Sequence, residues 1–243
     1  MPAASAASAS LITSAQTQGS YNVGATATGV PFTFLDVKTN SIQGMMVDVA
    51  TAVGATAGFK TTVQQTVFSA LIPSLTSSKI DIISAGMLKT AQRAEVVDFS
   101  SPVYSYGEGL IVKADDNKAY TSLDELKGEV VGAQVGTVFL DMLNKRGGFK
   151  EVRSYDPVAD LVRDIALGRV KAGVGDQPIM AYQLGQGVNA AVKLASAYKP
   201  VNVGDVCLVV RKGDAEMLAR VNKGIAAIKA DGTLPKIIAK WGL

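Results

Sequence analysis

Short runs of β-branched and apolar residues alternate with helical patterns along most of this chain, and this alternation constrains its fold more than any other feature. Runs of about five or six such residues are typical of buried strands. Apolar residues spaced four apart, as at Met45, Val49, Val53 and Ala57, form the stripe of a helix that lies on a sheet. Strands and helices in alternation predict an α/β protein.

The pattern divides into two sets of elements without an exact internal repeat. Strands are expected at residues 21–26, 32–35, 59–65, 80–84, 106–113, 130–134, 152–155, 170–175 and 206–211. Helices are expected at residues 45–57, 69–77, 137–145, 157–167, 177–184, 215–230 and 234–241. Two sets of this kind predict two α/β lobes, with the chain crossing between them near 109–113 and 203–207.

We therefore assign residues 21–110 with 206–243 to a discontinuous first lobe and residues 111–205 to a second. Residues 1–20 are rich in Ala, Ser, Thr and Gln and predict a disordered leader. This stretch has no basic segment and no continuous apolar core, so it is not an intact secretory signal. The chain contains no run of roughly 18 apolar residues, so no membrane span is predicted.

The side chains available exclude several kinds of chemistry. The chain has no histidine, so a Ser-His-Asp nucleophile, an imidazole acid or base and a histidine-ligated zinc are excluded. The single cysteine, Cys207, lies in an apolar run and indicates a packed thiol without a disulfide or metal role. Its 24 basic and 21 acidic residues are scattered, which argues against nucleic-acid binding. We expect no metal, no cofactor and no catalytic residue.

A series of short motifs then occurs in an order that resembles the polar amino-acid binding proteins of ABC importers, the extracellular solute-binding family 3. The resemblance covers roughly residues 21–243. The motifs are Val30-Pro-Phe-Thr-Phe34, Gln43-Gly-Met-Met-Val-Asp48, Ser69-Ala-Leu-Ile-Pro-Ser-Leu75, Thr90-Ala-Gln-Arg93, Val97-Asp-Phe-Ser100, Ser122-Leu-Asp-Glu-Leu-Lys-Gly128, Val131-Gly-Ala-Gln-Val-Gly-Thr137, Gly168-Arg-Val-Lys-Ala172 with Asp176, Asp231-Gly-Thr233 and Lys240-Trp-Gly242.

The resemblance implies a type II periplasmic-binding-protein fold, in which two lobes, each a central sheet flanked by helices, are joined by two crossing strands. It also implies a periplasmic, monomeric protein whose signal sequence is absent from this chain. Such a protein closes on an amino acid or a similar zwitterion and delivers it to a permease in the inner membrane.

The resemblance also implies which residues hold the ligand. Arg93 would bind its carboxylate, because a guanidinium offers two parallel donors. Asp176 would bind its ammonium at the carboxyl end of a strand. The first helical amides after Thr137, including that of Val138, would meet the carboxylate from the other lobe. A structural explanation exists for each: Arg93 solvated and paired with Glu95 or Asp98, and Thr137 and Asp176 as helix N-caps.

Further candidates are less constrained by the motifs. Phe68 is either an aromatic wall of the pocket or a core residue. Gly86 lets the ligand approach the backbone, where its carbonyl can accept from an ammonium. Glu108, near the first expected crossing, either reaches a donor on the ligand or is an exposed hinge carboxylate.

Three positions depart from the family pattern. Gly29 replaces a common aromatic residue, Leu88 replaces a serine or threonine that touches the carboxylate, and Thr26 stands near the place of an acidic residue that selects cationic ligands. These departures favour a ligand other than histidine, arginine or lysine. Two alternatives remain: a cyclohexadienyl or arogenate dehydratase on the same fold, with Glu108 or Asp176 as general acid, and a ligand-sensing domain.

Overall fold

A computed structural model describes residues 19–185 and 190–243. Residues 1–18 of the expected leader lie outside the described residues. Ser20, its last residue, instead begins strand β1 and pairs with Lys60. Within the described part of the chain, no helix is long and apolar enough to cross a membrane.

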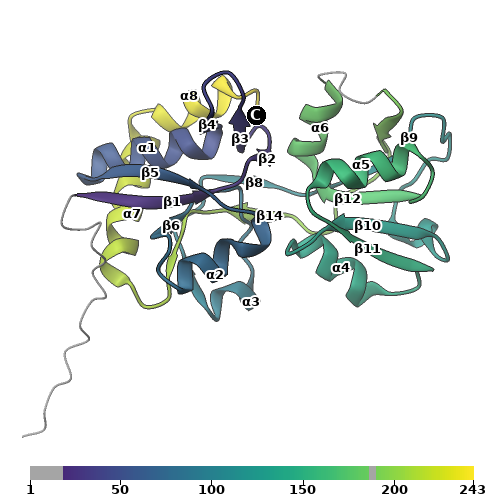
Figure 1. Ribbon diagram of the computed structural model, residues 1–243, viewed down its shortest axis with the longest axis horizontal. Coiled ribbons are helices and arrows are strands. Elements are labelled where there is room, and N and C mark those ends of the chain that lie inside the picture. The colour runs from purple at the N-terminus through teal and green to yellow at the C-terminus, as the bar shows by residue number, and fades with distance from the viewer. Residues whose placement is uncertain (1–18, 186–189) are drawn as a thin grey trace, which may run out of the picture.

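The molecule consists of two lobes that lie side by side (Figure 1). The first is built on a sheet with strand order β5-β1-β6-β15-β7. Its strands are β5 (Lys60–Gln65), β1 (Ser20–Ala25), β6 (Ile82–Ile83), β15 (Val209–Arg211) and β7 (Val97–Phe99). The strands β5, β1 and β6 are parallel, as expected when helices connect successive strands, whereas β15 runs antiparallel to its neighbours.

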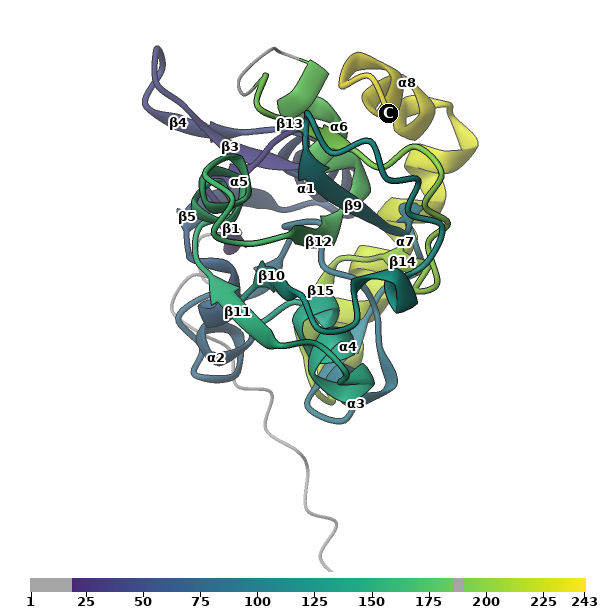
Figure 2. The same cartoon turned by 90° about the vertical axis from the view of Figure 1, so that its right-hand side faces the viewer.

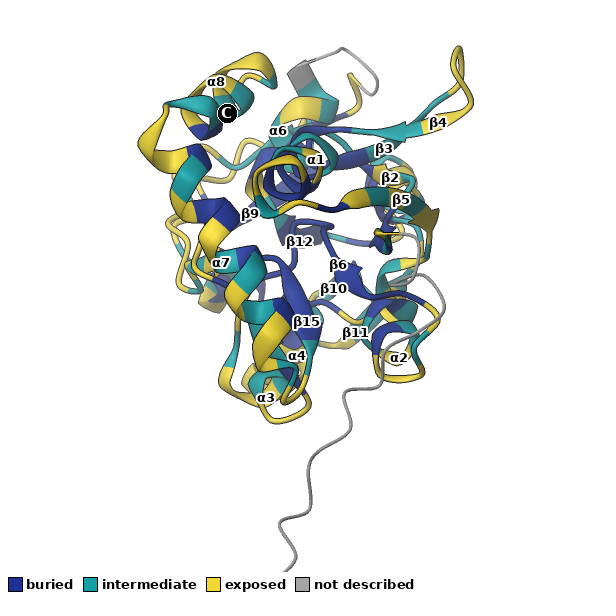
Figure 3. Ribbon diagram, turned by 90° about the vertical axis from the view of Figure 1, so that its left-hand side faces the viewer, coloured by how far each residue is buried: buried dark blue, intermediate teal, exposed yellow. Residues whose placement is uncertain are grey.

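Helices cover this sheet on both faces. Helix α1 (Met45–Ala57) packs on α7 (Ala215–Ala230) and α8 (Thr233–Lys240), while α2 (Leu71–Thr76) contacts β1 and β6. The stripe Met45, Val49 and Val53 is fully buried, which confirms the helix predicted from it. Figure 3 shows the buried residues gathered on the strands and the exposed ones on the outer sides of α7 and α8.

The first lobe also carries elements that the sequence pattern did not resolve. The expected strand at 32–35 is β3 (Thr33–Asp36), which joins a small separate sheet instead of the main one. Where one helix was expected at 69–77, a single 3₁₀ turn comes first and the α-helix α2 follows it. The remaining elements of this lobe are β2 (Thr28–Gly29), β4 (Ser41–Gln43), η2 (Phe68–Ala70) and α3 (Ala91–Ala94).

The second lobe has a sheet with strand order β11-β10-β12-β9-β13. Figure 2 looks onto this lobe. The strands are β11 (Glu151–Tyr155), β10 (Val130–Gln134), β12 (Ala172–Asp176), β9 (Glu108–Lys113) and β13 (Val192–Leu194). The helical elements are η3 (Leu123–Leu126), α4 (Val138–Arg146), α5 (Val158–Ala166) and α6 (Gln177–Gly185). Strands β10, β11 and β12 are parallel, so the carboxyl end of β12 and the turn before α4 face the same edge.

Two paired strands cross between the lobes, β8 (Tyr104–Tyr106) and β14 (Gly204–Val206). The second overlaps the expected crossing at 203–207. The first crossing was placed too late: residues 108–112 pair with β12 inside the second sheet, so 108–110 belong with the second lobe. The sequence pattern missed this because Tyr106 to Lys113 reads as one continuous strand, which the structure divides between two sheets at Gly107.

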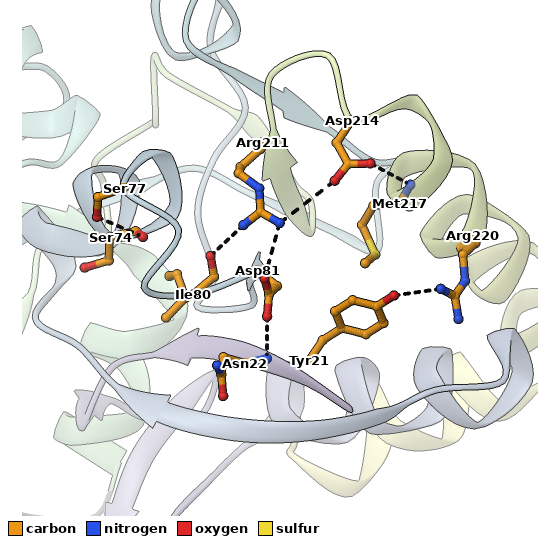
Figure 4. Close-up of polar contacts among 10 residues, drawn as sticks. All are labelled: Tyr21, Asn22, Ser74, Ser77, Ile80, Asp81, Arg211, Asp214, Met217 and Arg220. Carbon is orange, nitrogen blue, oxygen red and sulfur yellow. Dashed lines mark hydrogen bonds and ion pairs between the residues drawn. The ribbon is translucent and has the colours of Figure 1, made fainter. Parts of the chain in front are cut away.

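A buried ion pair stabilises the first sheet (Figure 4). Arg211 Nη2 lies 3.2 Å from Asp81 Oδ1, and the Arg211 Nη1 group donates to the Ile80 carbonyl at 2.9 Å. The other Asp81 oxygen accepts from the Asn22 amide. Because Asp81 is only 2% exposed, these partners replace the water that the ionised groups lose on folding.

Candidate functional site

Arg93 reaches from the first lobe to the second. The N-cap Thr90 hydroxyl accepts from the Arg93 amide at 3.1 Å, which fixes the short helix α3 and aims the side chain at the facing lobe. There the Arg93 Nη2 group donates to the Gly136 carbonyl at 2.9 Å. The expected alternative, an ion pair with Glu95 or Asp98, does not occur. Burial lowers the pKa of Arg93, while the nearby Asp176 carboxylate acts in the opposite direction.

Leu88 contributes its backbone and not its side chain. The Leu88 carbonyl accepts from Arg93 Nη1 at 2.6 Å, whereas the side chain packs against Gly204 of the second crossing strand. The side chain is 4% exposed and belongs to the hydrophobic core. The Leu88 backbone therefore positions Arg93, while its side chain packs in the core.

The turn before α4 faces Arg93 from the second lobe. Gly136 adopts φ +75°, and a Cβ built on it would lie 3.0 Å from Ser69 Cα of the first lobe, so this close approach requires glycine. Thr137 is the N-cap, as the alternative interpretation predicted, since its hydroxyl accepts from the Leu140 amide. Among the described residues, the Val138 and Phe139 amides form no backbone hydrogen bond outside their helix. These are the free donors expected of a helix start.

Asp176 ends strand β12, and its carboxylate accepts from the Tyr106 hydroxyl. The same hydroxyl lies 3.0 Å from the Gly86 carbonyl of the first lobe. Burial raises the pKa of Asp176 above its usual value, although the hydrogen bond from Tyr106 acts against this. Burial also raises the pKa of Tyr106, so the phenol keeps its proton.

Phe32 explains how Gly86 and Tyr106 come together. Its ring stacks on that of Tyr106 with centroids 5.4 Å apart, and it touches the Cβ position of Gly86 at 3.1 Å. Gly86 adopts φ +71°, a conformation that favours glycine. Tyr106 is 6% exposed, so packing around its ring holds its hydroxyl in place.

A small cavity of about 20 Å³ lies between the lobes, next to Asp176 and Phe68. Its lining also includes Gln134 and Met180 of the second lobe and Ala85 of the first. Phe68 both lines this cavity and packs on the core, so each of its two expected roles describes part of its environment. The Arg93 guanidinium carbon lies 5.8 Å from the centre of the Phe68 ring, within cation–π range.

Two of the three departures from the family pattern, Gly29 and Thr26, line this cavity. Gly29 leaves space that Ile179 of the second lobe enters, 3.5 Å from the Cβ position of Gly29. The Thr26 hydroxyl pairs with that of Thr33 at 2.7 Å. Asp176 is the only charged residue that lines the cavity among those described.

Glu108 is a buried carboxylate, so the expected alternative of an exposed hinge carboxylate is wrong. It is 1% exposed and accepts hydrogen bonds from the Tyr198 hydroxyl and from the Val201 and Asn202 amides. These donors precede the second crossing strand, so Glu108 ties the two crossing segments together. Spacing alone did not reveal this, because the donors lie 90 to 94 positions away along the chain.

A larger hollow, about 510 Å³, lies against the second sheet and is lined by charged residues such as Lys113, Asp115 and Arg169. Within the described residues, no group of three or more acidic or cysteine side chains is placed to hold a metal ion.

Comparison with known proteins identifies the family. The sequence profile of the bacterial extracellular solute-binding proteins, family 3, matches residues 21–243. The chain belongs to this family. Its relatives include the ABC transporter arginine-binding protein 1 of Escherichia coli (strain K12), 30% identical over 221 residues that make up 90% of this chain and 89% of the relative.

Solved structures of the same family share the two-lobed fold. An ancestral arginine-binding protein bound to glutamine superposes with a TM-score of 0.84 at 34% identity, covering 92% of this chain and 97% of the other. An ancestral amino acid-binding protein, AncCDT-1, described as a precursor of cyclohexadienyl dehydratase, gives 0.82 at 30% identity, covering 93% and 96%. The two-lobed α/β fold and the solute-binding family predicted from the motifs are confirmed.

Two residues at the cleft were not predicted, Tyr106 and Ile179. Tyr106 was included in an expected strand, and nothing in its spacing distinguishes it from a core aromatic. Ile179 was expected only as part of a helix. The glycine at position 29 was the available signal for Ile179, because a missing side chain on one lobe leaves room for one from the other.

Proposed function

We propose that this chain is the extracytoplasmic binding protein of an ABC importer, and that it holds an amino acid or a similar zwitterion between its two lobes. One observation carries the proposal. Arg93 and Asp176 both face the cleft, and among the described residues each has only uncharged hydrogen-bond partners. A zwitterion supplies the two charges that they lack, with its carboxylate toward Arg93 and its ammonium toward Asp176.

The chemistry of each end supports this orientation. Arg93 presents both terminal nitrogens, and the Leu88 and Gly136 carbonyls that they now contact are neutral acceptors that a carboxylate can replace. The free amides of Val138 and Phe139 lie on the turn that follows Gly136 and add donors from the second lobe. Ligand binding therefore exchanges contacts between the lobes for contacts through the ligand.

Closure and delivery follow from the architecture. The cavity of about 20 Å³ holds roughly one water molecule, so an amino acid enters only when the lobes separate. Two paired strands, β8 and β14, connect the lobes and permit a hinge motion. We expect a monomer that presents its closed form to a permease of the inner membrane from the periplasm.

We expect binding without turnover. Glu108, one of the two candidates for a general acid, has its carboxylate engaged by three donors of the chain. Asp176 is explained by an ammonium partner. Incubation with prephenate and with arogenate is expected to yield no aromatic product; formation of one would assign the chain to the dehydratases instead.

Calorimetry and thermal-shift measurements with the twenty amino acids test the proposal. A ligand at a hundredfold excess over its Kd stabilises the fold by about 2.7 kcal/mol. Arg93→Ala is expected to weaken binding by about 2 to 5 kcal/mol, since it leaves a buried carboxylate without a partner. The matched control is Arg169→Ala, which removes an exposed arginine from the second lobe. Equal affinities in wild type and Arg93→Ala would contradict the assignment.

A further inference from the structure

Three oxygen atoms meet where the hinge and both lobes come together. They are the Asp176 carboxylate of the second lobe, the Tyr106 hydroxyl of the first crossing strand and the Gly86 carbonyl of the first lobe. Tyr106 lies between the other two and is within hydrogen-bond distance of each. This arrangement joins the three parts of the molecule that move relative to one another during closure.

Counting hydrogens shows that this group is one donor short. An ionised carboxylate and a backbone carbonyl are acceptors only, and a phenol carries one hydrogen. The single Tyr106 hydrogen can point to Asp176 or to Gly86 but cannot fully satisfy both. The Asp176 carboxylate also accepts from its own backbone amide, and the two acceptors that share the Tyr106 hydrogen can take one more donor.

We propose that the ammonium group of the ligand is this donor, and that the Tyr106 oxygen accepts from it beside the Asp176 carboxylate. The proposal rests on the proposed function and names a residue for ligand selection. When the ammonium enters, the Tyr106 hydrogen turns to the Gly86 carbonyl, and the phenol oxygen accepts one ammonium hydrogen while Asp176 accepts another.

The fixed position of Tyr106 supports this role. Its ring is stacked on Phe32 and buried, so the hydroxyl cannot swing out of the cleft when a ligand arrives. A phenol oxygen accepts as well as donates, which lets it stay in place and change partners. The site therefore favours ligands with at least two N–H donors on nitrogen and disfavours quaternary amines and deaminated analogues.

The same hydrogen count predicts how binding depends on pH. A proton on Asp176 also supplies a donor and takes the place of the ammonium. The charged or titratable groups that face Asp176 are Tyr106 from β8 and Arg93 from α3. Affinity is thus expected to fall as acid protonates Asp176 in the free protein, in the range above 3.8 to which burial has raised its pKa.

Titration calorimetry of wild type and Tyr106→Phe tests the proposal with L-glutamine and L-arginine, each beside its analogue without the α-amino group, glutaramate and 5-guanidinopentanoate. Tyr106→Phe is expected to weaken amino-acid binding roughly 10-fold to 100-fold, as for one hydrogen bond to a charged group. Its affinity for the deaminated analogues is expected to change less than about threefold, because they lack the donor.

The matched control is Tyr104→Phe, which removes a hydroxyl from the same strand and the same aromatic cluster. It is expected to leave both affinities near those of wild type. Unchanged or tighter amino-acid binding by Tyr106→Phe overturns the proposal, and tighter binding assigns the hydroxyl as a competitor of the ligand. If wild type binds a different amino acid instead of these two, the same variants are compared with that amino acid and with its deaminated analogue.

Two further results distinguish failure of the proposed function from failure of the proposed role of Tyr106. If wild type binds no amino acid at all, both the proposed function and the role of Tyr106 fail. If wild type binds but its affinity does not fall on acidification, the role of Tyr106 and Asp176 as the acceptor site fails while the function stands. This pH profile needs only wild-type protein, so the test does not depend on how well the variant folds.

Discussion

Two buried sets of arginine and aspartate in this molecule differ in how their charges are matched. In the first lobe, Arg211 and Asp81 contact each other, and backbone groups complete their hydrogen bonds (Figure 4). In the cleft, Arg93 and Asp176 contact only neutral groups of the protein. The first set is electrically complete and stabilises one lobe. The second has the charges that we propose are matched by a zwitterion.

This contrast shows why burial of charge alone does not identify a binding site. Both arginines are shielded from water, but only Arg93 lies at a boundary between parts that can separate. The carbonyls that Arg93 contacts come from both lobes, so its partners change when the lobes move. The partners of Arg211, including Asp214 at 4.0 Å, all belong to the first lobe and stay together.

The largest effect on stability is expected from breaking the pair of Arg211 and Asp81. Asp81→Ala leaves Arg211 with only the more distant Asp214 carboxylate at 4.0 Å, and should lower the free energy of unfolding by up to about 3 kcal/mol. Urea unfolding measures this. Asp115→Ala, which removes a carboxylate that is 74% exposed, is the control and should change stability by less than about 1 kcal/mol. A small loss in Asp81→Ala would mean that the pair matters little to the lobe.

Glu108→Gln tests the boundary between the two lobes. The amide replaces one acceptor oxygen with a donor that faces other donors, so we expect a loss of about 1.5 to 3 kcal/mol in unfolding free energy. We also expect a larger radius of gyration in small-angle scattering, because the crossing segments are no longer tied. If Glu108 instead met the ligand, this variant would lose affinity and keep its stability.

Exchanging arginine for lysine should affect ligand binding at Arg93 and stability at Arg211. Arg93→Lys removes the two parallel donors and is expected to weaken ligand binding about tenfold, or about 1.4 kcal/mol, with little change in stability. Arg211→Lys is the matched exchange and should alter stability while leaving affinity unchanged. Calorimetry and urea unfolding on both variants measure this; the reverse assignment of effects would contradict the comparison.

The smallest effects are expected in the pH dependence of stability. Burial raises the pKa of Asp176, so its ionisation destabilises the fold, and Asp176→Asn should be more stable than wild type at pH 7. That difference should shrink as pH falls toward 3.8. The pair with Lys171 helps to lower the pKa of Asp116 to about 2 despite burial, so Asp116→Asn should lose stability at pH 7. Its loss should vanish between 3.8 and about 2.

Thermal unfolding as a function of pH, without ligand, checks both signs. Parallel pH profiles for the two variants would show that Asp116 and Asp176 occupy similar environments. Opposite slopes are expected, because both carboxylates accept from a phenol but only Asp116 also forms an ion pair, with Lys171 at 2.8 Å.

Most of the fold was predictable because its elements obey local periodicity. The stripe at Met45, Val49 and Val53 faces the core, and the parallel strands follow from helical connections between them. The division at Gly107 was not predictable, since the strand residues on either side look alike. Where a chain leaves one sheet for another depends on which partners lie across from it.

The site was predictable in part and for a similar reason. Arg93, Asp176 and Thr137 stand in motifs; Asp176 lines the cavity between the lobes, and Arg93 donates across to Gly136, the neighbour of Thr137. Leu88 and Glu108 were assigned to the ligand, but their contacts are with Arg93 and with the second crossing segment. Tyr106 was missed, because its importance comes from two acceptors that lie 20 and 70 positions away.

By itself the sequence determined the α/β class, the order of the elements and the exclusion of histidine and thiol chemistry, because these depend on residue type and on spacing along the chain. Only the tertiary structure decided which groups share a hydrogen or a charge. Hydrogen bonds and ion pairs act over a few ångströms, and those distances are set by packing between segments far apart in sequence. The unmatched charges of Arg93 and Asp176 are such a property of the folded molecule.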